Sequence, residues 1–134
     1  MAALHAQCFT VPRPWQADEF REMLALPENF ALDLPDGFLI GRILGPEAEL
    51  LTLAVAPKAR RKGVARRLLD SLKSHVMAAG VTELFLEVAT TNSAAIALYQ
   101  KSGFRDAGLR KDYYNGVNGE KVAALVMVSD LSTT

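Results

Sequence analysis

The spacing of hydrophobic residues changes along the chain, and each change marks a different predicted element. Val64, Leu68, Leu72 and Val76 recur at helical spacing, which predicts a helix over residues 64–79, and Gly80 follows where a C-cap glycine is expected. Short hydrophobic runs bounded by Gly, Pro and Asp predict strands. We therefore expect helices at 16–26, 64–79 and 93–102, and strands at 30–34, 38–44, 49–55, 83–89, 104–112 and 121–129.

The order of these elements indicates an α/β (α+β) fold. Antiparallel strands come first and a strand–helix–strand crossover follows, which predicts a mixed, mostly antiparallel sheet with helices on both sides. In the first full helix we expect Phe20, Met23 and Leu24 to face the core, after a helix end at 1–9 and a loop at 10–15. The chain has 134 residues, half of them hydrophobic, which is enough for one domain spanning residues 1–134.

Composition and charge exclude several classes of protein. The 15 basic and 15 acidic residues give a formal net charge of zero, whereas a nucleic-acid-binding domain is usually basic. The single cysteine, Cys8, permits no intrachain disulfide and favours a reducing compartment. No hydrophobic run reaches transmembrane length, no signal peptide opens the chain, and no metal-ligand spacing is present. We expect a cytoplasmic protein without a nucleic-acid, membrane or metal partner.

A basic segment between the strand at 49–55 and the helix at 64–79 predicts a phosphate site. Six lysines and arginines lie between Lys58 and Arg67, around Gly63. No Asp or Glu occurs from Leu50 to Leu69, so we expect no carboxylate nearby to oppose their positive field. The first turn of a helix has backbone N–H groups without helical partners, and its dipole favours an anion. A P-loop is excluded because Val64 follows Gly63, and a dinucleotide-binding turn is excluded because the segment has one glycine.

Two motifs together resemble those of a known superfamily. The first is Arg60-x-x-Gly63-x-Ala65, and the second runs from Leu84-Phe-Leu-Glu-Val88 through Asn92 to Leu98-Tyr99 and Gly103-Phe104. In this order and spacing they resemble the GNAT superfamily of acyl-CoA-dependent N-acetyltransferases. Within it, the chain is most similar to the ribosomal-protein-alanine N-acetyltransferases, which acetylate protein N-termini. Over residues 8–131, that similarity rests on Phe9…Pro14-Trp15, Leu86-Glu-Val88, Asn92-x-x-Ala95-Ile-Ala-Leu-Tyr99 and Arg110-Lys-Asp-Tyr-Tyr114.

The resemblance implies a fold, a reaction and a set of site residues. It implies a GNAT fold whose usual first strand is missing from this chain: either the native chain starts upstream of Met1, or the protein does without the strand, which would leave the strand at 30–34 as an unpaired sheet edge. It also implies transfer of the acetyl group of acetyl-CoA, as co-substrate, to a primary amine. The Val55 N–H would face the thioester oxygen. On this resemblance the acetyl-CoA-binding residues are Leu53, Ala54, Val55, Arg60, Arg61, Lys62, Gly63, Val64, Ala65, Arg66 and Asn92.

Glu87 is the candidate general base. It is an acidic residue in a strand that is otherwise hydrophobic on both faces, where carboxylates are uncommon unless they are paired or functional. A carboxylate there could take a proton from the acceptor ammonium, directly or through a water. The alternative is a structural ion pair with an arginine such as Arg110, or a position at a frayed strand end. The Leu-Glu-Val resemblance favours the base.

Tyr99 is the candidate general acid. Its hydroxyl, with an ordinary pKa near ~10, could protonate the departing thiolate, and the family's Leu-Tyr position supports that role. The alternative is an ordinary core tyrosine, since Ile96, Tyr99 and Gly103 share one side of the helix. Asn92 has two compatible roles, as helix N-cap and as an acetyl-CoA contact.

The acceptor is less well defined by the sequence. Trp15, Tyr113 and Tyr114 are candidate acceptor-binding residues, and the segment 120–123 departs from the acidic pair that relatives place before the last strand. A protein N-terminal α-amine is the first choice of acceptor. The alternative within the same class is a small-molecule amine acetyltransferase, a function that the same fold can host. From a different class, the chain could be a catalytically inactive CoA-binding regulatory module.

Overall fold

A computed structural model describes residues 17–59, 62–115 and 121–132, and the side chains of all of these except 112–115. The predicted helix end at 1–9 and loop at 10–15 lie outside the described residues, so the missing first strand stays a prediction. The described helices are α2 (Ala17–Ala25), α3 (Val64–Ala78) and α4 (Ser93–Lys101), with a short 3-10 helix at Pro57–Ala59. The strands are β1 (Asn29–Leu34), β2 (Gly37–Leu44), β3 (Glu47–Val55), β4 (Glu83–Ala89), β5 (Arg105–Asn115) and β6 (Lys121–Asp130).

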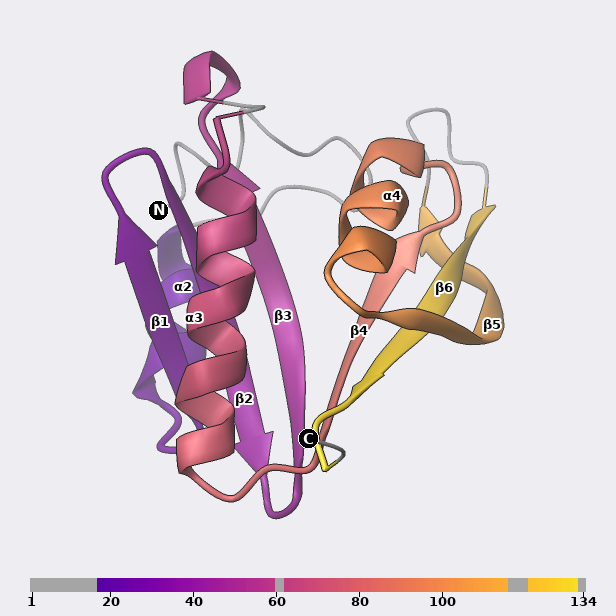
Figure 1. Cartoon of the computed structure of the whole chain (residues 1–134). Coiled ribbons are helices and arrows are strands. Elements are labelled where there is room, and N and C mark those ends of the chain that lie inside the picture. Colours follow the sequence, from indigo (N-terminus) through magenta and orange to yellow (C-terminus); the bar gives the residue numbers. More distant parts are fainter. Residues whose placement is uncertain (1–16, 60–61, 116–120, 133–134) are drawn as a thin grey trace.

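The described strands form one mixed sheet in the order β1-β2-β3-β4-β6-β5. Only the β3–β4 pair is parallel, because α3 carries the chain back between these two strands, and the other pairs are antiparallel. The predicted mixed, mostly antiparallel sheet is therefore confirmed. In Figure 1, α3 and α4 lie in front of the sheet and α2 lies behind it, as expected for helices on both sides.

Two hydrophobic clusters cover the two faces of the sheet. The larger one joins α3 and α4 to the sheet and includes the fully buried Leu39, Leu72, Leu84 and Met127. The smaller one joins α2 to the other face through Phe20, whose ring meets Phe38 edge-on with centroids 5.7 Å apart. In the described part of the chain, the sheet therefore lies between two separate hydrophobic layers.

Most predicted boundaries hold within one to three residues, and β4 has the predicted bounds. One prediction is wrong: Leu24 is 39% exposed instead of facing the core. The nine-residue helix α2 packs mainly through Phe20, and its last turn extends beyond this contact. Leu24 is therefore partly exposed to solvent, although it lies one helical turn after Phe20.

A bulge in β3 coincides with the point where β3 and β4 part. Ile40 pairs with Thr52 and the next residue, Gly41, pairs with Leu50, so Leu51 is an extra residue on β3. β3 pairs with β4 only from Glu47–Glu83 to Leu50–Leu86, although β3 itself continues to Val55. A bulge increases the local twist of a strand, which turns the end of β3 away from β4. Figure 1 shows these two strands diverging toward the N-terminus of α3.

Candidate active site

Gly63 forms the start of α3 in a conformation that suits a glycine. It is the N-cap residue with φ 78°, and no side chain caps the helix at this position. A Cβ built on Gly63 would meet no atom within 4 Å, so the space beside its backbone is open. Glycine tolerates a positive φ without steric cost and lets a ligand approach the backbone. This geometry fits a phosphate group at the helix N-terminus.

The other residues of the predicted phosphate site divide by exposure. Val64 is 6% exposed and packs in the larger cluster, so only its backbone is available to a ligand. Lys62 and Arg66 are exposed and can extend toward an anion, while Ala65 is half-buried. Arg60 and Arg61 lie outside the described residues. The role of this whole group in binding acetyl-CoA remains a prediction.

Carboxylates approach the basic segment in the folded chain, contrary to the sequence-based expectation. Asp36, in the turn between β1 and β2, places Oδ1 3.8 Å from Lys58 Nζ. Asp70 places Oδ1 3.8 Å from Arg66 Nε, one helical turn along α3. The expectation considered only residues 50–69, whereas folding brings Asp36 from a distant turn. Both pairs are exposed and therefore weak, so they compensate the positive charge only in part.

The end of β3 lines the divergence between the two parallel strands. Ala54 is buried in the smaller cluster, whereas Leu53 and Val55 pack against the larger one. The Ala56 N–H, just after the strand, donates to the Asp36 carbonyl at 2.8 Å. Beyond Leu50 the recorded pairing of β3 continues only with β2. Leu53–Val55 therefore lie beyond the part of β3 that pairs with β4, where an extended ligand between the two strands would lie.

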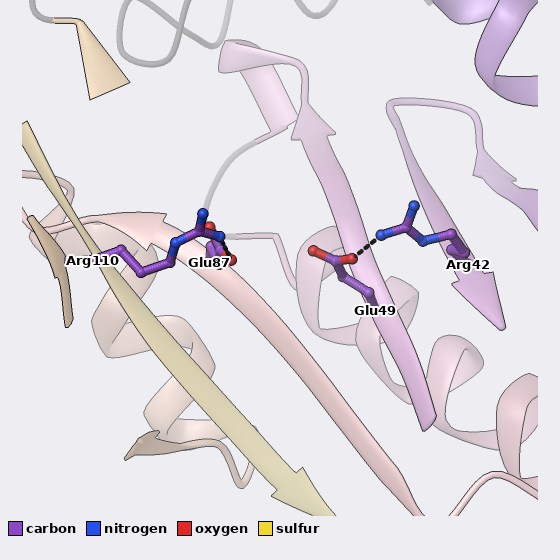
Figure 2. A network of polar contacts seen from close by, with 4 residues as sticks. All are labelled: Arg42, Glu49, Glu87 and Arg110. Atoms are coloured by element: carbon purple, nitrogen blue, oxygen red, sulfur yellow. Dashed lines mark hydrogen bonds and ion pairs between the residues drawn. The ribbon is translucent and has the colours of Figure 1, made fainter. Parts of the chain in front are cut away.

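Glu87 is the first residue of β4 beyond the last β3–β4 pair, Leu50–Leu86. Leu84, Leu86 and Val88 face the larger cluster, so alternation places Glu87 on the opposite face of the sheet. Its side chain is only 15% exposed, and its Oε1 accepts a hydrogen bond from Arg110 Nη1 at 2.7 Å. The ion pair considered from the sequence is thus present (Figure 2). It holds the carboxylate beside the strand divergence, where a base would be needed.

Tyr99 and Asn92 take the structural roles that the sequence allowed. Tyr99 is 9% exposed in the larger cluster, with its ring edge-on to Phe104 at 5.9 Å between centroids. This is the packing of a core tyrosine, and its role as general acid stays a prediction. The Asn92 side chain accepts a hydrogen bond from Ala95 N at 3.2 Å, which confirms it as the N-cap of α4.

The predicted acceptor residues are only partly described. Trp15 and Glu120 lie outside the described residues, and Tyr113 and Tyr114 belong to β5 by their backbone alone. The β5–β6 register is irregular between Arg110 and Tyr114, because Arg110 pairs with Ala124 and Tyr114 with Val122. Three residues of β5 therefore stand opposite one residue of β6. Such a bulge changes the direction of β5 just after Arg110.

The sequence reasoning missed a second half-buried carboxylate near the site. Glu49 is 15% exposed and accepts from Arg42 Nη2 at 2.5 Å, directly across the β2–β3 pair. Figure 2 shows this pair beside the Glu87–Arg110 pair, with the Glu49 carboxylate extending from β3 toward β4. Glu49 carries the same signal as Glu87, an acid among alternating hydrophobic residues, and could have been found by it. Glu49 lies opposite Phe85 where the sheet is still closed.

Among residues 17–59, 62–115 and 121–132, no group of three or more His, Cys, Asp or Glu side chains is arranged to hold a metal ion. No helix in the same part of the chain is long and hydrophobic enough to cross a membrane.

The chain combines a parallel strand pair that separates, a helix that begins at a glycine near the open end of that pair, and a half-buried acid beside it. These features are those of a known class of protein. The sequence model of the acetyltransferase (GNAT) family matches residues 2–104, and the chain belongs to this family. The family resemblance inferred from the two motifs is thereby confirmed.

Three similar proteins bear names of one kind. The chain is 39% identical over 89 residues to the ribosomal protein bS18-alanine N-acetyltransferase of Salmonella typhimurium, covering 66% of this chain and 60% of that protein. It is 36% identical over 122 residues to the N-alpha-acetyltransferase RimI of Mycobacterium tuberculosis, covering 84% and 75%. The crystal structure of the ribosomal-protein-S18-alanine N-acetyltransferase from Escherichia coli superposes with a TM-score of 0.86 at 29% identity, covering 99% and 86%. The match to the Salmonella relative spans about three fifths of that protein's length.

Proposed function

We propose that this chain is an N-acetyltransferase that moves the acetyl group of acetyl-CoA to a primary amine, in the first place the α-amine of a protein N-terminus. The observation that carries the proposal is the end of β3–β4 pairing at Leu50 and Leu86, with Glu87 as the next residue. The names of the similar proteins support the same acceptor, since they are alanine and N-alpha-acetyltransferases. The single cysteine supports the cytoplasmic location that the sequence predicted.

The residues present fit acetyl-CoA as co-substrate. The open space at Gly63 and the first N–H groups of α3 would receive the pyrophosphate, with Lys62 and Arg66 adding positive charge. The backbone of Leu53–Val55 would hold the pantetheine arm by strand-like hydrogen bonds. When bound, acetyl-CoA supplies the activated acetyl group as a thioester.

The proposed chemistry needs one base, one oxyanion donor and one acid. Glu87 takes a proton from the acceptor ammonium, which frees the nitrogen lone pair to attack the acetyl carbon. The Val55 N–H stabilises the negative charge that develops on the carbonyl oxygen. Tyr99 gives its proton to the thiolate as the carbon–sulfur bond breaks. The acetyl group passes directly to the amine, without a covalent intermediate on the enzyme.

A turnover assay with acetyl-CoA tests the proposal. Purified protein is offered peptides with free N-terminal alanine, the same peptides with blocked N-termini, and a panel of small amines, while CoA release is followed. We expect acetylation of the free peptides. Turnover with small amines alone would favour the small-molecule alternative. Tight acetyl-CoA binding without any turnover would favour the inactive CoA-binding module.

A further inference from the structure

Arg110 reaches the candidate base from two strands away, because β6 lies between β4 and β5. Glu87 of β4 pairs with Val126 of β6, and Arg110 of β5 pairs with Ala124 of β6. Because directly paired residues share a face and alternate residues along a strand share a face, all four side chains project from one side. Neighbouring strands lie about 4.8 Å apart, so the Arg110 backbone is roughly 10 Å to the side of β4. Its side chain spans the whole width of β6 to place Nη1 2.7 Å from Glu87 Oε1.

The face that Arg110 crosses carries two small residues. Ala124 has the smallest side chain that L-residues offer, and Gly108, which pairs with Val126, carries none. A Cβ built on Gly108 would meet no atom within 4 Å. A guanidinium can therefore lie over β6 beside Glu87 without displacing side chains from the core.

The two partners of this ion pair differ in their exposure. The Glu87 side chain is 15% exposed and comes from an inner strand, whereas that of Arg110 is 52% exposed and comes from the outermost strand on this side of the described sheet. An exposed ion pair adds little to stability. A half-buried carboxylate held by a charged, directional donor is fixed in orientation. The contact is thus better suited to aiming the carboxylate than to stabilising the fold.

We propose that Arg110 is a positioning residue for Glu87 in the proposed acetyl transfer. Its guanidinium holds Oε1 and so fixes the orientation of the carboxylate beside the divergence of β3 and β4, where the acceptor ammonium is proposed to bind. A guanidinium has no acceptor atom and does not lose its proton, so Arg110 cannot itself be the base and is proposed to act by orienting Glu87. The inference rests on the proposed function, because it gives Glu87 the role of base.

A second ion pair on the same face provides a matched control. Arg42 and Glu49 are also an arginine and a carboxylate that is 15% exposed, but they are direct neighbours on β2 and β3. Their contact lies where the sheet is still closed. Arg42→Gln removes the same kind of charged hydrogen bond at a position that the proposed mechanism does not use.

Steady-state kinetics of Arg110→Gln, Arg110→Lys and Arg42→Gln test the proposal on the whole chain. We expect Arg110→Gln to lower kcat by roughly 10- to 100-fold, the order of loss caused by a misplaced reacting group, while the acceptor KM and the acetyl-CoA Kd stay near wild type. Arg110→Lys keeps the charge but not the planar fork, and should recover part of kcat. Arg42→Gln should keep kcat near wild type. Melting temperatures show whether each variant is folded.

A double-mutant cycle decides whether Arg110 acts through Glu87. In the Glu87→Gln background, Arg110→Gln should cause no further loss of kcat, because the carboxylate that it positions is gone. Losses that multiply in the double variant would overturn the proposal. So would a near-wild-type kcat of Arg110→Gln, or a raised acceptor KM with unchanged kcat, which would make Arg110 an acceptor-binding residue. A wild-type protein without turnover on any amine would instead refute the proposed function, and the positioning role with it.

Discussion

Leu50 of β3 and Leu86 of β4 are the last residues at which the two parallel strands pair. Both are buried in the larger cluster, which also contains the buried residues of α3. Beyond it, the bulge at Leu51 turns β3 away, and Glu87 follows Leu86 directly. The position of the candidate base relative to the opening is thus set by two hydrophobic residues and one extra residue in a strand.

Replacing Gly63 with Val should abolish acetyl-CoA binding, because a side chain would fill the open space where the pyrophosphate is proposed to approach the backbone. A β-branched residue is also strained at φ 78°. Isothermal titration calorimetry with acetyl-CoA measures the effect.

Gly80→Val is the matched control for this strain. Gly80 has φ 86° at the other end of α3, also with no atom within 4 Å of a built Cβ. It should lose about 1–3 kcal/mol of stability from backbone strain but keep acetyl-CoA affinity. Tight binding by a folded Gly63→Val protein would contradict the proposed pyrophosphate site.

Neutralising Arg66 should have a smaller effect than filling the space at Gly63. Arg66→Gln should weaken acetyl-CoA binding by only ~1–2 kcal/mol, as for one charged hydrogen bond. The Asp70 carboxylate, 3.8 Å from Arg66 Nε, already compensates part of the charge. Arg67→Gln, with the same charge change on the next residue of the helix, should have less effect in the same titration. Equal losses in the two variants would indicate a general field and not a specific contact.

The proposed acid and base have separate tests. Glu87→Gln should lower kcat by roughly 10²–10⁴-fold with acetyl-CoA affinity unchanged, since it removes a proton acceptor but keeps the shape. Glu49→Gln, at the other carboxylate that is 15% exposed, should retain most of kcat because Glu49 faces the closed part of the sheet. If Glu49→Gln had the larger loss, the base would be assigned to β3.

Tyr99→Phe should also reduce kcat. The phenyl ring keeps the edge-on contact with Phe104, so the melting temperature should change little while the proton donor is lost. Turnover equal to wild type from pH 6 to pH 9 would leave Tyr99 as a core residue only.

The acceptor preference follows from the proton that must be removed. An α-amino group titrates near ~7.7–8.0 and a lysine amine near ~10.4, so at neutral pH an N-terminus needs less assistance to become a nucleophile. A peptide with a free N-terminal alanine and an internal lysine should be acetylated at its α-amine. Mass spectrometry of the product locates the label. Label on the lysine side chain, or on small amines alone, would contradict the proposed acceptor.

Lys73 should make stability depend on pH in the alkaline range. Its Nζ donates to the Ser102 carbonyl and lies 5.5 Å from the centroid of the Phe104 ring. Burial lowers the pKa of Lys73 from its ordinary value of 10.5; Asp70 opposes this shift and Arg66 adds to it. The folded chain therefore binds fewer protons at this group than the unfolded chain, and the free energy of unfolding contributed by Lys73 rises as the pH rises toward 10.5.

Urea unfolding of wild type and Lys73→Met between pH 7 and pH 10 checks this sign. The stability of wild type relative to the variant should increase with pH, and by a small amount because Lys73 is only partly buried. The lost hydrogen bond to Ser102 shifts the two curves by a constant and does not change their slopes. Parallel curves would contradict the prediction.

Periodicity and glycine positions in the sequence were sufficient to predict the elements and the mixed sheet. The helix at 64–78 shows it most clearly, because Val64, Leu68, Leu72 and Val76 are all buried and Gly80 ends the run. Such local signals are informative because side-chain periodicity determines which face of an element is hydrophobic. Residue type also determines which φ values the backbone tolerates. The same signals placed Asn92 at a helix N-terminus and Gly63 before one.

Contacts between distant parts of the chain could be decided only by the tertiary structure. The sequence offered Arg110 as one partner for Glu87 but did not show that it crosses β6, and it did not show that Asp36 approaches Lys58 or that Glu49 pairs with Arg42. These contacts depend on strand order and register, which one extra residue at Leu51 changes. Alternation within a strand determines which side chains share a face, but only the assembled sheet determines which of them meet.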